Sequence, residues 1–376
     1  MNDDIRPKPP TQAQTAAVPP TKYQVRKRVR WWLKSLSRKQ FIAAVVIFFL
    51  VVAGGAYALW RAGQHPASRE PDVALVDVPE PTTIASRMTG VEVPIPLNQL
   101  PVTGVMIENS PDARPQAGLA QADMVYEAVS EGGITRFLAL YQESQPDHIG
   151  PVRSIRPYYL DFLVPYDAAL AHAGGSAEGL AQIRSQGIKD LDHGANGSTY
   201  QRVSNRYAPH NLYTSRAKLL DLQNRKGFTS STYTGFVRKE KDTPAATPTA
   251  QAIDLTVSSF LYNPHYDYDA ATNTYKRSQG GKPHTDERSG AQIAPKVVIG
   301  LVSPHHYAGI YSVYQVTGSG AATIFQDGVA IAATWTKANR ASEFVFKDAT
   351  GAVIPLNPGQ TWITLVGAAG NIKYLP

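Results

Sequence analysis

The segment Phe41–Trp60 restricts the fold of this chain more than any other feature of its sequence. It runs for twenty residues without a charged side chain, and as an α-helix it would rise about 30 Å, enough to cross the hydrocarbon core of a bilayer. Trp31 and Trp32 precede it and Tyr57 lies near its other end, as an interfacial aromatic belt requires. The sequence therefore predicts a single transmembrane helix at residues 41–60.

The charges on either side of this segment predict its orientation. Residues 21–40 contain eight Lys or Arg side chains, whereas residues 61–80 contain only Arg61 and Arg69. Because the more basic flank stays in the cytoplasm, we expect a basic cytoplasmic arm at residues 1–40. Everything after the helix would then be extracytoplasmic, and the protein would be a single-pass protein of the cell membrane.

A cleaved signal peptide is the alternative interpretation of the same segment. Ala56-Tyr57-Ala58 has the small-x-small form of a cleavage site, so that a mature chain would begin near Leu59. An n-region of forty residues and so long an apolar stretch are unusual for a signal peptide, which favours an uncleaved signal-anchor.

The net charge of +7 is confined to the N-terminal arm. Residues 1–40 hold ten Lys or Arg against two Asp, whereas the other 336 residues hold 27 basic and 28 acidic side chains. We therefore expect no nucleic acid among the partners of the main part. The chain also lacks cysteine, which excludes disulfides, thiolate metal sites and a lipid-modified cysteine anchor. The sequence predicts no cofactor.

Two changes of composition divide the part of the chain that follows the helix. Residues 61–96 are rich in proline and lack a sustained period, which predicts a stalk. Residues 237–251 contain VRKEKDTPAATPTA and predict a linker. We therefore expect one domain at residues 97–236 and a second domain at residues 252–376.

The two predicted domains belong to different fold classes. In the first, short apolar runs alternate with helical stretches such as AEGLAQIRSQG, which is typical of an α/β (α+β) domain with a mixed sheet; the runs are VTGVMIEN, ADMVYEAV, RFLALYQ and AALAHA. The second is a mostly-β domain, with strand-like runs that include KVVIGLV, VAIAATW and TWITLVG. Asp327-Gly328 predicts a type I′ hairpin between two of its strands.

The densest group of candidate binding residues is IGPVRSIRPYYLDF. Arg153 and Arg156 are three residues apart, and Pro157 predicts a helix that starts directly after them. Two guanidiniums beside a helix N-terminus offer bidentate donors and a favourable dipole to an anion. Arg136 follows Gly132-Gly133 and could join them. In the alternative, the arginines pair only with nearby carboxylates, of which the candidates are Glu127, Glu131 and Asp161.

Other polar residues are weaker candidates for ligand binding. His172 ends a predicted strand before a glycine turn and a helix that Ser176 would cap, an arrangement that a purely structural role also explains. His210 and Asn211 lie beside Pro209 in a loop, where polar residues favour binding. The candidates in the C-terminal segment are Arg277, His284 and Asp286. No spacing matches a calcium loop or a zinc motif, so we expect no metal site.

Several longer stretches carry a family resemblance over about Pro101–Leu365. They are ARPQAGLAQADMVYEAVSEGGITRFLALYQ, IGPVRSIRPYYLDF, APHNLYTS, YKRSQGGKPHTD and DGVAIAATW…NPGQTWITL. Together they resemble the YerB-like family of bacterial cell-envelope proteins, which carry a paired N-terminal and C-terminal domain of unknown function. The resemblance implies an envelope location but no established reaction. Family members are typically lipoproteins tethered through a cysteine, so the apolar helix would replace that anchor in this chain.

A second likeness concerns chemistry. A strand, an Arg-containing Ser-Ile loop and a strand ending in Ala-x-Ala-x-Gly-Gly before a helix are similar in order to the LytR–CpsA–Psr glycopolymer transferases. In that family loop arginines bind a polyprenyl pyrophosphate, which implies such a role for Arg153 and Arg156 only. This chain departs from the family by having RSIRPY in place of an Ile-Pro-Arg-Asp order.

Three functions therefore stand side by side. The main hypothesis is a membrane-anchored envelope protein that binds an anionic component, a cell-wall glycopolymer or a polyprenyl phosphate or pyrophosphate, through Arg136, Arg153 and Arg156. A phosphotransferase would additionally need a metal or a base, for which the candidates are Glu127, Glu131 and Asp123. The third is a non-catalytic scaffold that contacts wall-synthesis proteins.

Overall fold

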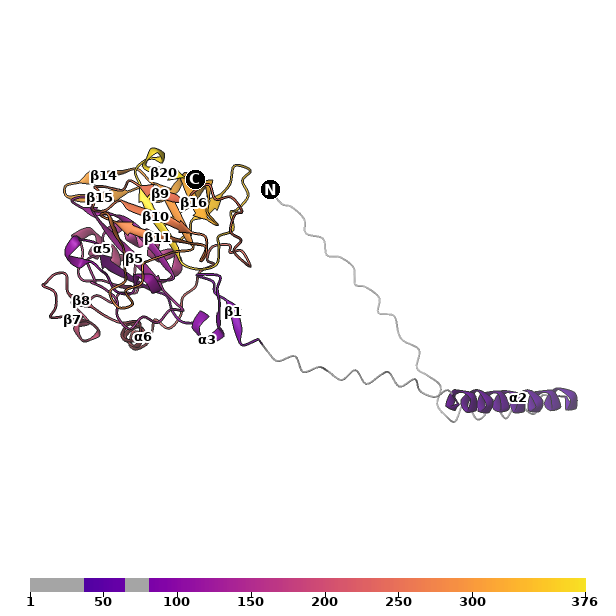
Figure 1. Ribbon diagram of the computed structural model, residues 1–376. Helices are drawn as coiled ribbons and strands as arrows, with labels where there is room; N and C mark the ends of the chain where they lie inside the picture. Colours follow the sequence, from indigo (N-terminus) through magenta and orange to yellow (C-terminus); the bar gives the residue numbers. More distant parts are fainter. Residues whose placement is uncertain (1–36, 65–80) are drawn as a thin grey trace, which may run out of the picture. The chain divides into compact units, whose positions relative to one another are not determined.

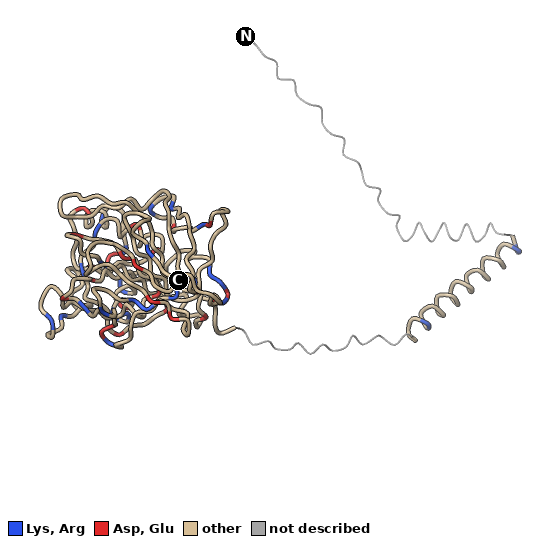
Figure 2. The backbone as a smooth tube through the Cα atoms, turned by 45° about the horizontal axis from the view of Figure 1, so that its top comes forward, with Lys and Arg blue, Asp and Glu red and all other residues tan. Residues whose placement is uncertain are grey.

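The structure is a computed structural model that describes residues 37–64 and 81–376, so the predicted basic arm lies almost wholly outside the described residues. The chain divides into two compact units, Met1–Pro79 and Glu80–Pro376. In the first, helix α2 spans Arg38–Gly63, and Ser37 and Gln40 form a capping box at its start. By length and composition α2 could cross a membrane, and no residue of this helix is buried. Figure 2 shows its basic residues at its two ends.

Most of the second unit is built on a mixed sheet of eleven strands (Figure 1). Nine strands form its main path, in the order β18 (Val345–Lys347), β17 (Val329–Lys337), β16 (Gly318–Gln326), β13 (Val297–Val302), β19 (Thr361–Val366), β4 (Met124–Glu131), β5 (Ile134–Tyr141), β3 (Thr103–Glu108) and β6 (Ala169–Ala171). The other two form the hairpin β14 (His305–Ala308) and β15 (Tyr311–Tyr314), which joins β4 at Glu131.

A second sheet of five strands packs beside the first. Its order is β12 (Lys282–Pro283), β11 (Thr274–Gln279), β10 (Pro264–Asp269), β9 (Ala252–Leu255) and β20 (Ile372–Leu375). The β10–β11 hairpin of this sheet was not among the strands predicted from the sequence. Its alternation puts Tyr266 and Tyr275 into a small core with Val298 and Phe325 of the large sheet, and the intervening polar residues remain outside.

The helices of this unit are short. They are α3 (Ile95–Asn98), α4 (Leu160–Leu163), α5 (Ala177–Ser185) and α6 (Arg216–Arg225), with 3-10 turns η1 (Pro111–Ala113), η2 (Leu119–Gln121), η3 (Pro157–Tyr159), η4 (Val164–Tyr166), η5 (Gly197–Thr199) and η6 (Ala369–Asn371). Two small hairpins complete the inventory, β1 (Thr83–Ala85) with β2 (Glu92–Pro94) and β7 (Gln201–Arg202) with β8 (Leu212–Tyr213). Ser176 accepts from the amide of Gly179, which confirms the predicted cap of α5.

The large sheet unites the two segments that the sequence divides. β19, from the C-terminal segment, lies between β13 and β4 and is parallel to both. Ile363 is opposite Ile299 on one side and Tyr126 on the other, and all three are buried in the same core. Residues 97–236 and 252–376, which we predicted as two domains, therefore share one sheet and form parts of one compact unit.

Two segments predicted to lie between domains are also folded. Of the predicted stalk, residues 81–96 form the β1–β2 hairpin, and Met88 within it is fully buried. Of the predicted linker, Arg238 donates to Asn357 O at 3.0 Å and to Thr361 Oγ1 at 2.9 Å. These two segments were not predicted to be folded because they lack the periodic apolar pattern of a helix or a strand. They pack instead through a few anchoring side chains.

Other features of the fold class are confirmed. The N-terminal segment is mixed α/β and the C-terminal segment is rich in strands. Asp327 and Gly328, with φ of 57° and 77°, join β16 to β17 as the predicted two-residue hairpin turn.

Candidate functional site

Arg136 and Arg156 meet at one carboxylate, Glu131. The strand β5 brings Arg136 to Glu131 Oε1 at 2.5 Å, and Arg156 donates through Nε to Glu131 Oε2 at 2.9 Å. Both guanidiniums are almost fully enclosed, with 4% and 6% of the side chain exposed. Partial burial alone would raise the pKa of Glu131, but the two arginines hold it below its ordinary value. These arginines are engaged in an ion-pair network.

Arg153 belongs to a second, more open group. Its Nε lies 3.2 Å from Glu108 Oε1, and 28% of its side chain is exposed. The other oxygen of Glu108 lies 3.0 Å from His210 Nδ1, and Ser110 Oγ donates to Glu108 Oε1 at 2.9 Å. Glu108 is the cross-strand partner of Arg136, so the predicted arginines do lie at the same end of the β3–β5 pair. Of the three, Arg153 alone retains substantial exposure.

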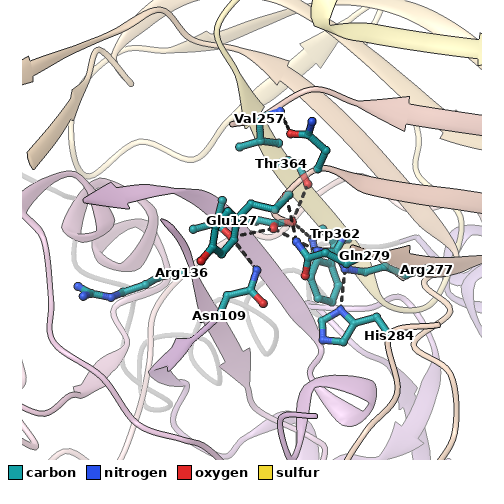
Figure 3. A network of polar contacts seen from close by, with 12 residues as sticks. Asn109, Glu127, Arg136, Val257, Arg277, Gln279, His284, Trp362 and Thr364 are labelled. Atoms are coloured by element: carbon teal, nitrogen blue, oxygen red, sulfur yellow. Dashed lines mark hydrogen bonds and ion pairs between the residues drawn. The ribbon is translucent and has the colours of Figure 1, made fainter. Parts of the chain in front are cut away.

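A buried network joins the N-terminal and C-terminal segments (Figure 3). Glu127 and Arg277 are both fully buried and form an ion pair of 3.1 Å. Glu127 also accepts from Trp362 Nε1 at 3.1 Å and from Thr364 Oγ1 at 3.3 Å, while Thr135 Oγ1 donates to its other oxygen. With every carboxylate oxygen engaged, Glu127 is not placed to serve as a base.

His284 extends this network toward the surface. Arg277 Nε donates to its Nδ1 at 3.0 Å, and its Nε2 lies 2.8 Å from Gln116 Oε1. Burial, together with the charges of Arg277 and Arg114, holds the pKa of His284 well below its ordinary value. The ring is therefore neutral, with the proton on Nε2 donated to Gln116. Gln116 in turn donates to Glu108 O, which connects the buried network to the Arg153 group.

An open pocket of about 460 Å³ lies directly beside His284, and we call it the cationic pocket. It is lined by Pro111, Arg114, Pro115, Leu261, Gln279, Gly280, Lys282, Pro283, His284 and Thr285. Arg114 is held in place because it donates to Asn109 Oδ1 at 3.1 Å and to Leu261 O at 2.7 Å. Gln279 is 6% exposed, and its Oε1 has no hydrogen-bond donor among the described residues.

The electrostatics of this pocket favour an anion. Among the described residues that line it there is no Asp or Glu, whereas Arg114 and Lys282 are both basic. Burial and the repulsion of Arg277 lower the pKa of Arg114, so its charge is incompletely compensated by the surrounding protein. An anion placed here would offset that repulsion and accept hydrogen bonds from a fixed guanidinium.

The remaining predicted residues serve the local structure. His172 is fully buried, with Nδ1 2.8 Å from Gly174 O and Nε2 3.0 Å from Asp190 Oδ1. Asn211 donates to Val203 O and holds the loop before β8. Asp286 accepts from the amide of Gly118 at 2.7 Å. These contacts explain the residues without a ligand.

Within the described residues, the carboxylates that a phosphotransferase would need as a base or as metal ligands are already held by other contacts. Asp123 is 6% exposed, and its Oδ2 accepts from the amides of Gln142 and Glu143. Within residues 37–64 and 81–376 no three His, Cys, Asp or Glu side chains are grouped to hold a metal ion.

Arg114, Gln279 and Lys282 were not among the residues predicted from the sequence. Arg114 and Lys282 lie in the ARPQ and GGKPH stretches that carry the family resemblance, which could have indicated them. Their meeting in one pocket depends on the contact between the β3–β4 connection and the β11–β12 hairpin. Gln116 and Asp286 form an isolated bridge at that contact, 170 residues apart in the chain.

Comparison with known proteins identifies the family. Residues 88–229 match the N-terminal domain, and residues 253–363 the C-terminal domain, of the proteins of unknown function called DUF3048. Over 286 residues the chain is 32% identical to "Putative lipoprotein YerB" of Bacillus subtilis, covering 74% of this chain and 85% of that protein. The crystal structure of the YerB protein from Bacillus subtilis superposes with a TM-score of 0.70 at 27% identity, covering 77% of this chain and 99% of that one. This chain therefore belongs to the YerB-like family, with its paired N-terminal and C-terminal domains of unknown function.

Proposed function

We propose that this protein is a membrane-tethered protein of the cell envelope whose folded unit binds an anionic group of an envelope component. Two observations support the tether. Helix α2 is long and apolar enough to span a bilayer, and the Bacillus subtilis relative carries the name "Putative lipoprotein YerB". Since this chain has no cysteine to carry a lipid, the helix takes over the anchoring role.

The observation that carries the binding function is the composition of the cationic pocket. Arg114 provides a guanidinium fixed by the protein, and Lys282 provides an ammonium that forms no ion pair with residues 37–64 or 81–376. Arg153, on the neighbouring surface, contributes through its exposed part. Arg136 and Arg156 support the surrounding structure instead of contacting the ligand, because both are buried and both pair with Glu131.

The binding function is tested by titrating inorganic pyrophosphate into the full chain in lipid nanodiscs and measuring the heat. We expect Lys282→Gln to weaken pyrophosphate binding about tenfold, the scale of one lost charged hydrogen bond, without changing the melting temperature. Arg225→Gln is the matched control, because Arg225 pairs with Asp221 on the exposed face of α6 and makes the same change in net charge. Wild-type protein that gives no heat with millimolar pyrophosphate would refute the proposal.

The tether has its own test. The positive flank of α2 leads us to expect that protease added to intact protoplasts degrades the unit Glu80–Pro376 but spares the N-terminal arm. Immunoblotting with one tag at each end distinguishes the two fragments. Complete protection of the C-terminal tag would reverse the orientation, and a mature chain starting near Leu59 would establish cleavage instead of anchoring.

A further inference from the structure

A second pocket lies beside η3 and the β14–β15 hairpin, and we call it the tyrosine pocket. Its volume is about 480 Å³, within the range of sites that hold a small ligand. Its walls come from both segments of the chain: η3 and α5 from the first, and the β14–β15 hairpin and Arg340 from the second. It shares no lining residue with the cationic pocket.

Three tyrosine rings line this pocket, and two are fixed by their hydroxyl groups. Tyr158 Oη donates to Val129 O at 2.5 Å, and Tyr314 Oη accepts from the amide of Val129 at 3.1 Å. The two rings lie 4.9 Å apart, edge to face. Tyr311, the third, has the Arg156 guanidinium 4.8 Å from its ring centroid. The rings therefore form a rigid aromatic wall, against which the apolar face of a ring-shaped ligand can pack without ordering further side chains.

The polar side of the pocket is a chain of hydrogen-bonded groups with a net negative charge. Arg340 donates to Asp161 Oδ1 at 2.8 Å and to Gln182 Oε1 at 2.9 Å. Gln182 donates to Glu178 Oε1 at 3.1 Å. One guanidinium thus faces two carboxylates, which disfavours an anion but provides both donors and acceptors for hydroxyl groups.

One group in the pocket lacks a partner. Ser312 is 2% exposed, and its Oγ makes no hydrogen bond with the described residues. A buried hydroxyl without a partner is unfavourable, and such groups in folded proteins call for an explanation. A ligand hydroxyl or amide that reached Ser312 would complete its hydrogen bonding.

We propose that the tyrosine pocket binds a neutral sugar residue of a glycan. A pyranose ring combines an apolar face, which suits the tyrosine wall, with equatorial hydroxyl groups, which suit Asp161, Gln182 and Arg340. Such a ligand carries no negative charge that the two carboxylates of the pocket would repel. This site differs from the anion site in both its residues and its ligand, so each can fail without the other.

The test titrates chitotetraose, a neutral oligomer of N-acetylglucosamine, into the full chain in lipid nanodiscs by calorimetry. We expect Ser312→Ala to weaken binding roughly fivefold, the value of one neutral hydrogen bond, and Tyr311→Ala to weaken it more. Ser312→Ala should leave the melting temperature unchanged or raised, because it removes a buried hydroxyl that has no partner among the described residues.

Ser130→Ala is the matched control for Ser312→Ala. Ser130 lies on β4, is fully buried and also has an unpartnered Oγ within the described part of the chain, but it does not line the pocket. Its substitution should leave chitotetraose binding unchanged. The proposal is overturned if wild-type protein shows no heat at about 10 mM chitotetraose, or if Ser312→Ala and wild-type protein bind the oligomer equally.

Discussion

The arginines of the candidate site differ in how they pair with a carboxylate and in how much of the side chain is exposed. Arg156 donates to Glu131 through two nitrogens and to Ile155 O at 2.6 Å, with 6% of its side chain exposed. Arg153 Nε lies 3.2 Å from Glu108 Oε1, but among residues 37–64 and 81–376 it has no acceptor with hydrogen-bond geometry. A lysine keeps the charge but offers a single ammonium in place of the planar fork. Replacement by lysine should therefore change the free energy of unfolding more at Arg156 than at Arg153.

We expect Arg156→Lys to lower the free energy of unfolding by about 1–3 kcal/mol, because buried polar groups lose partners. Arg153→Lys should change it by less than about 0.5 kcal/mol, as is usual for a partly exposed side chain. Urea unfolding of both variants measures the difference. Equal destabilisation by the two substitutions would contradict this assignment of roles.

His172 gives the stability of the fold a dependence on pH. Burial alone would lower the pKa of His172, but its hydrogen bonds to Asp190 and Gly174 O raise it above the ordinary value. A raised pKa in the folded state means that the stabilisation is complete below about pH 6.5, the unfolded value, and is lost as the pH rises through the folded value. The pKa of Asp190 is lowered by the same partner, despite its partial burial, so its share disappears only in acid.

Unfolding of wild type and His172→Gln in urea at pH 5.5 and pH 8.5 tests this linkage. The stability advantage of wild type should be larger at the lower pH. An advantage that stays constant, or grows toward pH 8.5, would show that the imidazole is not charged in the folded protein.

At a turn, replacing one glycine can strain the backbone, create a steric clash, or do both. In the β16–β17 hairpin, Gly328 has a φ of 77°, and an added Cβ would lie 2.7 Å from Tyr268 Cε1. Gly351 has a similar φ of 86° but open space around its Cβ position. Both substitutions to alanine incur backbone strain, and only the first also creates a clash.

Gly351→Ala should therefore lower the free energy of unfolding by about 1 kcal/mol, and Gly328→Ala by a further 1–2 kcal/mol or so. Thermal unfolding followed by circular dichroism compares the two. If Gly351→Ala proved the more damaging, the packing of Tyr268 against the turn would be wrong.

The elements also show what sequence could predict. Strands β3, β4, β5, β13 and β19 were predicted because their apolar runs are continuous, as expected for strands buried on both faces. The β10–β11 hairpin was not predicted because its inward residues are tyrosines and polar residues such as Arg277, without an apolar run. Among the site residues, the pairing of Arg156 with Glu131 was foreseen as an alternative. The meeting of Arg114 with Lys282 was not, since it depends on contacts between distant segments.

At the scale of the whole molecule, the main feature is that the N-terminal and C-terminal segments supply each other's buried hydrogen-bond and ion-pair partners. Glu127 of β4 is fully buried against Arg277, Trp362 and Thr364, all from the C-terminal segment. Without that segment the carboxylate would be left buried without its charged partner, which is strongly destabilising. The match to the N-terminal family domain ends at residue 229 and the match to the C-terminal domain begins at residue 253. The main hydrophobic core nevertheless contains residues from both.

We therefore expect that residues 81–236 and 252–376, expressed separately, each fail to give a cooperative unfolding transition. The joined unit should unfold in one step, since a shared sheet and core couple the segments. Limited proteolysis of the three proteins provides an independent measurement. A protease-resistant, cooperatively unfolding fragment from either half would restore the division into two domains.

The position of β19 has a consequence for how the protein comes into being. A chain made or exported from its N-terminus emerges with β4 first, and the strand that must lie directly beside β4 and β13 emerges among the last, at Thr361–Val366. Until then the slot between those two strands stays empty, and their edges and apolar faces have no lasting cover. Nearly the entire polypeptide must therefore clear the ribosome or translocon before the sheet can close. During this delay the nascent chain stays unfolded enough to pass through a translocon, and it depends on chaperones to keep it from aggregating.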